Sequence, residues 1–281
     1  MYALIIGYGF VGKSVARFLS KSSQYRCDCH EVSCKILVHD ITIGTTLIDY
    51  LVKYSNDISI IFICLPTPES EDGSVNTKAI YHTVSILGDY LYEGMKVVLK
   101  STVPPMTTNK LNKLYNVPIA FSPEFIGETK RSYKEVEDYP IHYCGGDPVV
   151  CEYLLSIYES VYEKLQLQLQ FKIHFTEDLE VSKYMINCWL ATKLSFCEEF
   201  YRICKISGAR WESVKSIYEA DPRVENSYTD LENIDKGFIF GGKCLPKDLA
   251  AMVNLLPGGI LEAVKKSNKI QINQSLDHHK L

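Results

Sequence analysis

The chain has 281 residues, of which 46% are hydrophobic and 23% are charged, so it can bury the core of one large domain or of two smaller ones. Its formal net charge of -4 excludes a global basic surface for nucleic acid or for an anionic membrane. The 10 cysteines are too sparse for a disulfide scaffold at this length, and they predict reduced thiols in a cytoplasmic protein.

Membrane insertion and export are both unexpected from the sequence. The apolar start at residues 1–10 is too short for a signal-peptide core and has no basic residues ahead of it. No stretch approaches the roughly 20 apolar residues that a membrane-spanning helix needs.

Short apolar, β-branched runs alternate with helical segments over residues 1–175. This alternation is typical of parallel strands joined by crossover helices, and strands that are apolar on both faces need helices on both sides of the sheet. We therefore predict an α/β fold, with a Rossmann-like, doubly wound parallel sheet in a first domain of residues 1–175. Strands are expected at 2–7, 35–40, 58–65, 96–101, 117–122, 141–146 and 171–175, and helices at 13–20, 45–54, 76–92, 107–114 and 148–165.

The character of the sequence changes at Thr176, where one long helix is predicted over residues 176–207. No glycine or proline interrupts it before Gly208, and Thr176 is a suitable N-cap with two acidic residues after it. Apolar residues occupy more of its faces than a surface helix needs, which predicts pairing with a second copy in a homodimer. Further helices are expected at 210–219 and from Asp248, with a break near 257–259, in a helical central and dimerisation domain of residues 176–281.

One segment, "CDCHEVSC", gathers four potential metal ligands in Cys27, Cys29, His30 and Cys34. It lacks the paired C-x2-C spacing from which tetrahedral zinc sites are usually built. We therefore predict no metal, and interpret the segment as a surface insertion between a helix and the next strand.

Gly7, Gly9 and Gly12 form a G-x-G-x-x-G pattern directly after the first strand and at the start of a helix. Glycines there permit a tight turn, the close approach of a pyrophosphate and close helix packing, which predicts dinucleotide binding. A tight turn without a ligand is the alternative. Asp40 ends the second strand, where a carboxylate accepts hydrogen bonds from ribose hydroxyls and repels a 2′-phosphate, so NAD is favoured over NADP. The cysteine-rich insertion explains the long gap before Asp40.

The stretch "GFIFGGKCLPKD" places Cys244 after two glycines and ahead of a Pro-Lys-Asp triplet. Free cysteine is often a buried, inert apolar residue, whereas an accessible thiolate is a nucleophile. The stretch alone leaves both interpretations open.

A set of separated motifs resembles the UDP-glucose 6-dehydrogenase and GDP-mannose dehydrogenase family of nucleotide-sugar oxidising enzymes. The resemblance covers residues 1 to about 274, and several motifs in the expected order are more specific than one glycine pattern. The motifs are "GYGFVG" from Gly7, "CLPTPESEDGSVN" from Cys64, "STVPP" from Ser101, "SPEF" from Ser122, "EVSKYMINCWLATKLSFCEEF" from Glu180, "DPR" from Asp221 and "FGGKCLPKD" from Phe240.

The resemblance implies a reaction in which a sugar C6 alcohol is oxidised twice by NAD to the acid. UDP-glucose is the favoured substrate, and UDP-glucuronate is then the product. In the family, a cysteine captures the intermediate aldehyde as a thiohemiacetal, whose oxidation gives a thioester that water hydrolyses. By motif position, Cys244 is this nucleophile, and Asp248 is the general base or water-positioning group.

The remaining site residues also follow from the resemblance. Lys183 and Asn187 share one face of the long helix and match the groups that stabilise the developing oxyanion. Thr102 and Glu124 follow two strands and match the groups that assist thioester hydrolysis. Cofactor contacts are expected from Gly7, Tyr8, Gly9, Phe10, Val11, Gly12, Asp40, Pro66, Thr67, Ser101 and Thr102. Substrate contacts are expected from Glu124, Phe125, Lys183, Asn187, Gly241, Lys247 and Arg223, the last in the site of the neighbouring subunit.

Each polar residue of this set has an ordinary structural alternative. Lys183 and Asn187 could lie on a solvated helix face, Glu124 could be a helix N-terminal carboxylate, and Asp248 could cap the final helix. The family spacing favours the functional set over these alternatives.

The sequence departs from the family pattern in three places. Lys243 stands where a small residue is usual, and its cation could favour the Cys244 thiolate or block the sugar. Ile239 replaces a glycine, which predicts a reshaped substrate pocket. Family members carry a third, nucleotide-binding domain, and this chain stops at "DHHKL", so we expect weaker contacts to the nucleotide.

The leading hypothesis is a compact NAD-dependent nucleotide-sugar 6-dehydrogenase. A second is an oxidoreductase of a smaller alcohol, such as a sugar phosphate or a hydroxy acid. A third is a non-catalytic NAD-binding or assembly protein in which Cys244 has no chemical role. A substrate panel separates the first two, and the formation of reduced nicotinamide separates both from the third.

Overall fold

The structure of the protein is a computed structural model that describes residues 1–25, 35–42, 46–54, 56–90, 92, 94–127, 132–224 and 239–278. The cysteine-rich segment, for which the sequence predicts no metal, lies outside the described residues. The chain divides into two compact units: Met1–Thr67 with Asn76–Lys183, and Pro68–Val75 with Tyr184–Leu281. The predicted boundary between residues 175 and 176 stays a prediction.

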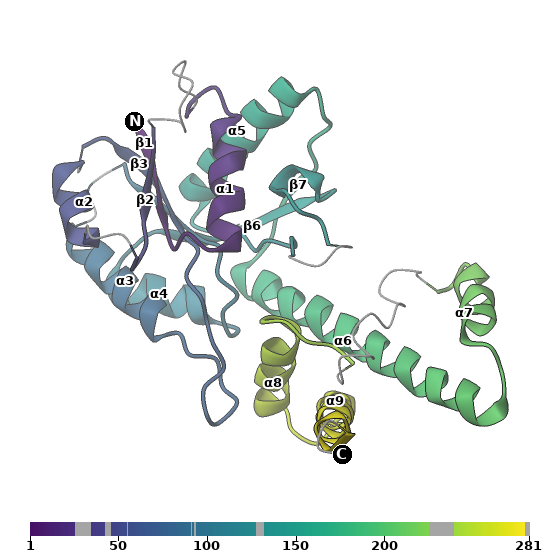
Figure 1. Cartoon of the computed structure of the whole chain (residues 1–281). Coiled ribbons are helices and arrows are strands. Elements are labelled where there is room, and N and C mark those ends of the chain that lie inside the picture. The colour runs from purple at the N-terminus through teal and green to yellow at the C-terminus, as the bar shows by residue number, and fades with distance from the viewer. Residues whose placement is uncertain are drawn as a thin grey trace. The chain divides into compact units, whose positions relative to one another are not determined.

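A seven-stranded sheet forms the centre of the first unit, in the order β2-β1-β3-β4-β5-β6-β7 (Figure 1). Neighbouring strands run parallel from β2 to β5 and again between β6 and β7, which confirms the predicted α/β, Rossmann-like fold. The strands are β1 (Tyr2–Ile6), β2 (Ile36–His39), β3 (Ile58–Ile63), β4 (Lys96–Leu99), β5 (Ile119–Phe121), β6 (His142–Gly146) and β7 (Phe171–Ile173).

The expectation that every neighbouring pair of strands is parallel was wrong at one step, because β6 pairs with β5 in the antiparallel direction. A parallel return needs a crossover connection, usually a helix, that brings the chain back to the same edge of the sheet. In the described residues between β5 and β6 there is only a short 3-10 turn, Val136–Asp138. The chain therefore enters β6 from the opposite edge.

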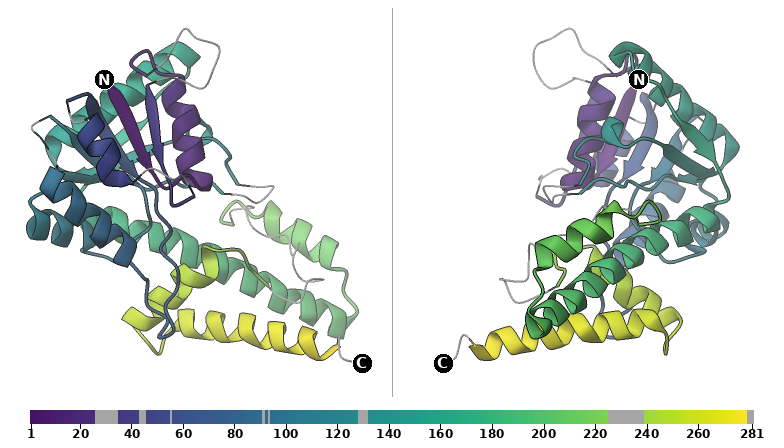
Figure 2. Two further views of the ribbon diagram at one scale, coloured as in Figure 1. Left: turned by 60° about the vertical axis from the view of Figure 1, so that its left-hand side comes forward. Right: turned by 90° about the vertical axis from the view of Figure 1, so that its right-hand side faces the viewer.

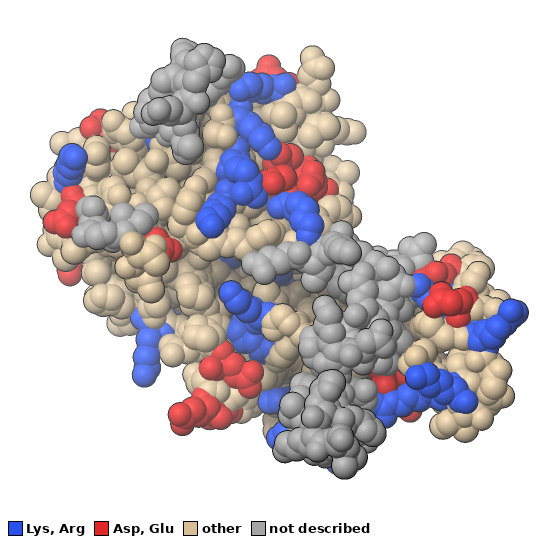
Figure 3. Space-filling view, viewed as in Figure 1, with Lys and Arg blue, Asp and Glu red and all other residues tan. Residues whose placement is uncertain are grey.

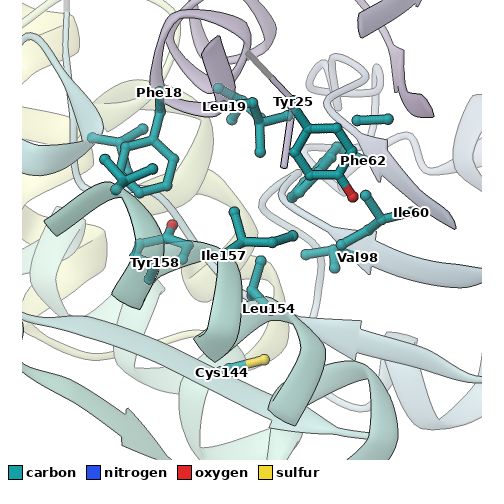
Figure 4. Packing of buried hydrophobic residues seen from close by; sticks show 14 of the residues in the cluster. Phe18, Leu19, Tyr25, Ile60, Phe62, Val98, Cys144, Leu154, Ile157 and Tyr158 are labelled. Carbon is teal, nitrogen blue, oxygen red and sulfur yellow. The ribbon is translucent and has the colours of Figure 1, made fainter. Parts of the chain in front are cut away.

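Helices cover both faces of this sheet, as apolar strands require. On one face, α1 (Phe10–Ser20) and α5 (Pro148–Leu165) share a cluster of buried side chains with the strands, and Figure 4 shows Phe18 of α1 beside Tyr158 of α5. Full burial of each such side chain contributes about 1.5–3 kcal/mol relative to exposure. The other face carries α2 (Leu47–Lys53), α3 (Lys78–Tyr90) and α4 (Thr107–Tyr115).

Charged side chains of both signs share the face drawn in Figure 3, with basic residues gathered over α1 and acidic ones beside them. Arg17 of α1 pairs with Glu135 at 2.9 Å, and Lys21 pairs with Glu137. Basic side chains of α1 and of the residue after it are therefore paired with acidic ones on this face.

The second unit is helical. The predicted long helix is confirmed as α6 (Thr176–Ser207), which runs on from the first unit and which Figure 2 shows as a single unbroken helix. It is followed by α7 (Trp211–Ala220), α8 (Leu245–Leu255) and α9 (Ile260–His278). The core of the unit includes Leu194 of α6, Leu249 of α8 and Val264 of α9.

The helix predicted from Asp248 begins earlier, at Leu245. Pro246 lies in its first turn, where a missing N–H costs no helical hydrogen bond. Cys244 thus becomes the N-cap of α8, and Asp248 lies inside the helix instead of capping it.

Candidate active site

The glycine loop joins β1 to α1 at the point where the strand order reverses, since β1 has β2 on one side and β3 on the other. Gly7 has φ +91°, and a Cβ there would come within 2.7 Å of the Cys64 carbonyl oxygen. A Cβ on Gly12 would overlap the Gly7 carbonyl oxygen. Both glycines are therefore required by the close approach of backbone segments, independently of any ligand.

Gly9 differs from these two, because a Cβ there would meet nothing within 4 Å. It is the N-cap of α1, it makes no side-chain cap, and the first turn of α1 carries no acidic residue. A helix N-terminus with free backbone N–H groups and no local negative charge favours an anion. The open space beside Gly9 fits the pyrophosphate of a dinucleotide, flanked by the partly buried Tyr8, Phe10 and Val11.

Asp40 follows β2 and is tied to the same loop. Its Oδ2 accepts a hydrogen bond from the Tyr8 backbone N–H at 2.8 Å, and its Oδ1 accepts from the backbone N–H and hydroxyl of Thr42 at 3.1 and 2.9 Å. These hydrogen bonds, with that of Tyr8 the largest cause, lower the pKa of Asp40. An anionic carboxylate is thus fixed next to the glycine loop, where it suits ribose hydroxyls.

The ends of β3 and β4 bring four predicted cofactor residues together. Thr67 donates a hydrogen bond through its hydroxyl to the Thr102 carbonyl oxygen at 2.8 Å, and Ser101 donates to the Leu65 carbonyl oxygen at 2.7 Å. Pro66 lies exposed between Leu65 and Thr67. These residues form one rim at the carboxyl edge of the sheet, where doubly wound folds bind ligands.

Glu124 lies in the loop after β5, so the alternative that it begins a helix was wrong. Its Oε1 accepts a hydrogen bond at 2.6 Å from Lys100, and the two side chains are only 4% and 1% exposed. Lys100 was missed by the sequence reasoning. The available signal was a lysine that directly follows the buried apolar strand β4.

Lys183 of α6 is buried and reaches the same loop. Its Nζ donates a hydrogen bond to the Glu124 main-chain carbonyl oxygen at 2.8 Å and lies 4.7 Å from the centroid of the Phe125 ring. Three predicted substrate residues, Glu124, Phe125 and Lys183, are therefore in contact. The alternative that Lys183 and Asn187 lie on a solvated face was wrong, because both are buried.

A second group of predicted residues is assembled within the second unit. The Asn187 side-chain amide donates to Asp248 Oδ2 at 2.5 Å, and Lys247 forms an ion pair with Asp248 Oδ1. The Asp248 side chain is 1% exposed. Its carboxylate is therefore held on both oxygens, one turn along α8 from Cys244.

Cys244 itself is exposed, so the interpretation as a buried apolar residue was wrong. Its carbonyl oxygen accepts a hydrogen bond from the Asp248 N–H at 2.9 Å, which starts α8. The thiol lies at a helix N-terminus, where negative charge is favoured. The preceding Lys243 is exposed, and Gly241 is half-buried.

Arg223 is 87% exposed and pairs with Asp221 through Nε at 2.9 Å and Nη2 at 2.6 Å. The segment that follows it, 225–238, lies outside the described residues. Within the described ranges, no three His, Cys, Asp or Glu side chains gather as a metal-binding group. Nor does any described helix combine the length and the apolar character needed to cross a membrane.

A cleft of about 930 Å³ lies elsewhere in the first unit, at the start of α6. Its lining includes Asn109, His174, Phe175 and Glu177, and none of the predicted site residues. Glu177 is already engaged, because its carboxylate accepts a hydrogen bond from the Asn109 side chain at 3.0 Å. The chemistry predicted from the sequence therefore does not belong to this cleft.

Two stretches of the chain match a known protein family. Residues 45–166 match the NAD binding domain of the UDP-glucose/GDP-mannose dehydrogenase family, and residues 177–273 match its central domain. The chain belongs to this family. Membership confirms the resemblance found in the sequence and establishes that an NAD-binding domain is present.

Individual members of the family show how much is shared. UDP-glucose 6-dehydrogenase from Rickettsia typhi is 30% identical over 234 residues, which cover 78% of this chain and 51% of the relative. UDP-glucose 6-dehydrogenase YwqF from Bacillus subtilis is 30% identical over 228 residues, which cover 76% of this chain and 49% of the relative. The chain thus spans about half the length of the curated relatives it matches.

Solved structures share the fold. UDP-D-ManNAc dehydrogenase from Pyrococcus horikoshii has a TM-score of 0.74 at 17% identity, and covers 96% of this chain and 69% of its own. A UDP-glucose dehydrogenase from Pyrobaculum islandicum has a TM-score of 0.72 at 22% identity, and the match covers 96% of this chain and 68% of the other. At these identities the likeness concerns the fold.

Proposed function

We propose that the protein is an NAD-dependent nucleotide-sugar 6-dehydrogenase that oxidises the C6 alcohol of UDP-glucose to the acid through a thioester on Cys244. The observation that carries the proposal is the exposed Cys244 at the start of α8, one turn from the buried Asp248, whose carboxylate binds Asn187 and Lys247. The glycine loop and Asp40 supply a site that fits a dinucleotide. The names of the relatives favour UDP-glucose as the substrate.

Bound NAD would supply the hydride acceptor for both oxidations. The alcohol loses a hydride and a proton to become an aldehyde, and the Cys244 thiol adds across its carbonyl to form a thiohemiacetal. The thiohemiacetal loses a second hydride and a proton, which leaves a thioester. Water then adds to the thioester carbonyl and displaces the thiolate, so the acid is released and the cysteine is regenerated.

The chain's own residues would stabilise charge during these steps. We assign the Lys183 ammonium and the Asn187 amide to the developing oxyanions, because donors aimed at forming charge lower the barrier most. Asp248 orients Asn187 and Lys247 through its two oxygens, and it is the proposed base or water-positioning group. Thr102 and Glu124 are proposed to assist hydrolysis of the thioester.

We also propose that the protein is a homodimer built on α6. This helix exposes several large apolar side chains, among them Met185 at 73%, Trp189 at 55% and Ile206 at 87%. A second copy packed along α6 would remove these side chains from water. Arg223 is proposed to reach the substrate site of the neighbouring subunit. The free thiols of the described cysteines support a cytoplasmic location.

The test is to incubate the purified chain with NAD and UDP-glucose and to measure reduced nicotinamide and the acid together. The proposal expects two reduced nicotinamides for each acid formed. Oxidation of a sugar phosphate or a hydroxy acid, but not of UDP-glucose, would instead support the enzyme of a smaller alcohol. NAD binding without oxidation of any substrate in the panel would support the non-catalytic protein.

A further inference from the structure

Lys100 is the residue directly after β4, and its side chain is enclosed in the first unit. Its backbone N–H donates to the Ile63 carbonyl oxygen at 2.9 Å, which continues the pairing of β3 with β4. Its Nζ donates to Ser122 Oγ at 2.9 Å, to Glu124 Oε1 at 2.6 Å and to Tyr158 OH at 3.2 Å. An ammonium has three donors, so all three are used.

The titratable groups around Lys100 are held in their neutral forms. Burial, followed by the charge of Lys100, lowers the pKa of His142 to about 3, and burial raises the pKa of Cys64 to about 12. Burial also raises the pKa of Tyr158, and the hydrogen bond to Cys151 raises the pKa of Cys144. Among these described neighbours, Glu124 is the group that balances the charge of Lys100.

Glu124 is hydrogen-bonded to a lysine through its side chain and to a second lysine through its main chain. Its carboxylate binds Lys100, while its main-chain carbonyl oxygen accepts the hydrogen bond from Lys183 Nζ at 2.8 Å. A shift of the carboxylate moves the loop that carries this carbonyl, and with it the acceptor that holds Lys183. The two lysines are thus linked through one residue.

We propose that Lys100 is a positioning residue: its ammonium fixes Glu124, whose main-chain carbonyl in turn fixes the ammonium of Lys183. The effect on catalysis rests on the proposed function, in which Lys183 stabilises developing negative charge. A group that must meet a developing charge loses much of its effect when displaced by about 1 Å. Loss of Lys100 therefore slows the oxidation while the glycine loop and Asp40 keep their affinity for NAD.

The test compares Lys100→Met with two milder variants on α5. Tyr158→Phe removes a hydroxyl that touches both Lys100 and Glu124. Tyr162→Phe is the matched control, because it makes the same change one turn along the helix, where the hydroxyl binds His142 and the Glu137 carbonyl oxygen. If Lys100→Met does not fold, the two tyrosine variants carry the comparison.

The first measurement needs no activity. In protein labelled with ¹⁵N-lysine, the side-chain signal of Lys183 is assigned by its absence from Lys183→Arg. The proposal expects that signal to move or to exchange faster with water in Lys100→Met and in Tyr158→Phe, and to stay in place in Tyr162→Phe. An unchanged Lys183 signal in the first two variants would overturn the proposal, whether or not the parent oxidises a sugar.

The second measurement is steady-state oxidation of UDP-glucose. We expect kcat to fall about tenfold or more in Lys100→Met, with the Kd for NAD within about twofold of the parent. Equal kcat in Lys100→Met and the parent would overturn the positioning role. If the parent oxidises no substrate, only the proposed function is contradicted. The Lys183 signal then tests on its own whether Lys100 positions Lys183 through Glu124.

Discussion

The side-chain amide of Asn187 on α6 donates a hydrogen bond of 2.5 Å to the carboxylate of Asp248 on α8, across 61 residues of sequence. Both side chains are buried, and Lys247 binds the other oxygen of the carboxylate. This bond joins the long helix to α8, the helix whose N-cap is Cys244. It therefore connects two of the motifs through which the sequence resembles its family.

Asn187→Ala is expected to lower the free energy of unfolding of the second unit by about 1–3 kcal/mol, because one carboxylate oxygen is left buried without its donor. The measurement is chemical denaturation followed by circular dichroism. Asn254→Ala makes the same change at an exposed position of α8 and should leave the stability near that of the parent. Equal effects of the two substitutions would show that the Asn187–Asp248 bond is not structural.

The cofactor preference is predicted from Asp40. The parent should bind NAD more tightly than NADP, since the fixed carboxylate beside the glycine loop repels a 2′-phosphate. Asp40→Ser should lower the ratio of the Kd for NADP to the Kd for NAD by about tenfold, as measured by calorimetry. Asp89→Ser, at an exposed position of α3, is the control. Equal affinity of the parent for the two cofactors would contradict the assignment.

Stability should fall in mild acid because of His142. Its pKa is lowered from 6.5 to about 3 in the folded protein, mainly by burial, so only the unfolded chain takes up this proton between those values. The contribution of neutral His142 to the free energy of unfolding is fully present above about pH 6.5 and is lost as the pH drops toward 3. At pH 5 the loss is about 2 kcal/mol.

The check is the slope of unfolding free energy against pH between 7 and 5 in His142→Gln, compared with the parent. Replacement of the buried imidazole should flatten the slope, whatever its effect on stability at neutral pH. His174→Gln is the matched control at an exposed position, and it should keep the slope of the parent. Identical slopes in all three proteins would refute the prediction.

Dimerisation is predicted to depend on the apolar surface of α6. Ile206→Glu should convert the dimer to a monomer at micromolar concentration, because a carboxylate would be buried in the interface without a partner. Light scattering measures the mass. Ile41→Glu, at a residue that is 96% exposed in the first unit, should leave the dimer intact. A parent that is monomeric at micromolar concentration rules the homodimer out.

Local patterns predicted much of this molecule. The glycine loop, the long helix and Asp40 at the end of its strand each depend on spacing within one short stretch, where sequence carries the geometry directly. The start of α8 lies three residues before the predicted start at Asp248, because Pro246 suits the first turn of a helix.

The parts that could not be predicted depend on contacts between distant segments. Lys100 and Glu124 are 24 residues apart, and they meet because β4 and β5 are neighbours in the sheet. The antiparallel direction of β6 depends on the route of the connection before it, and the pattern of residues within β6 does not indicate that route. Family motifs identified Glu124 as a site residue, but its carboxylate could be placed only once its buried partner was known.

The most direct test of the covalent mechanism is mass spectrometry of the acid-quenched protein after incubation with NAD and UDP-glucose, compared for the parent, Cys244→Ala and Cys204→Ala. We predict a covalent adduct that hydroxylamine removes in the parent and in Cys204→Ala, whose cysteine is buried in α6. Cys244→Ala should show neither the adduct nor the acid, while its Kd for NAD is unchanged. Acid formation at the parental rate in Cys244→Ala would contradict the covalent mechanism.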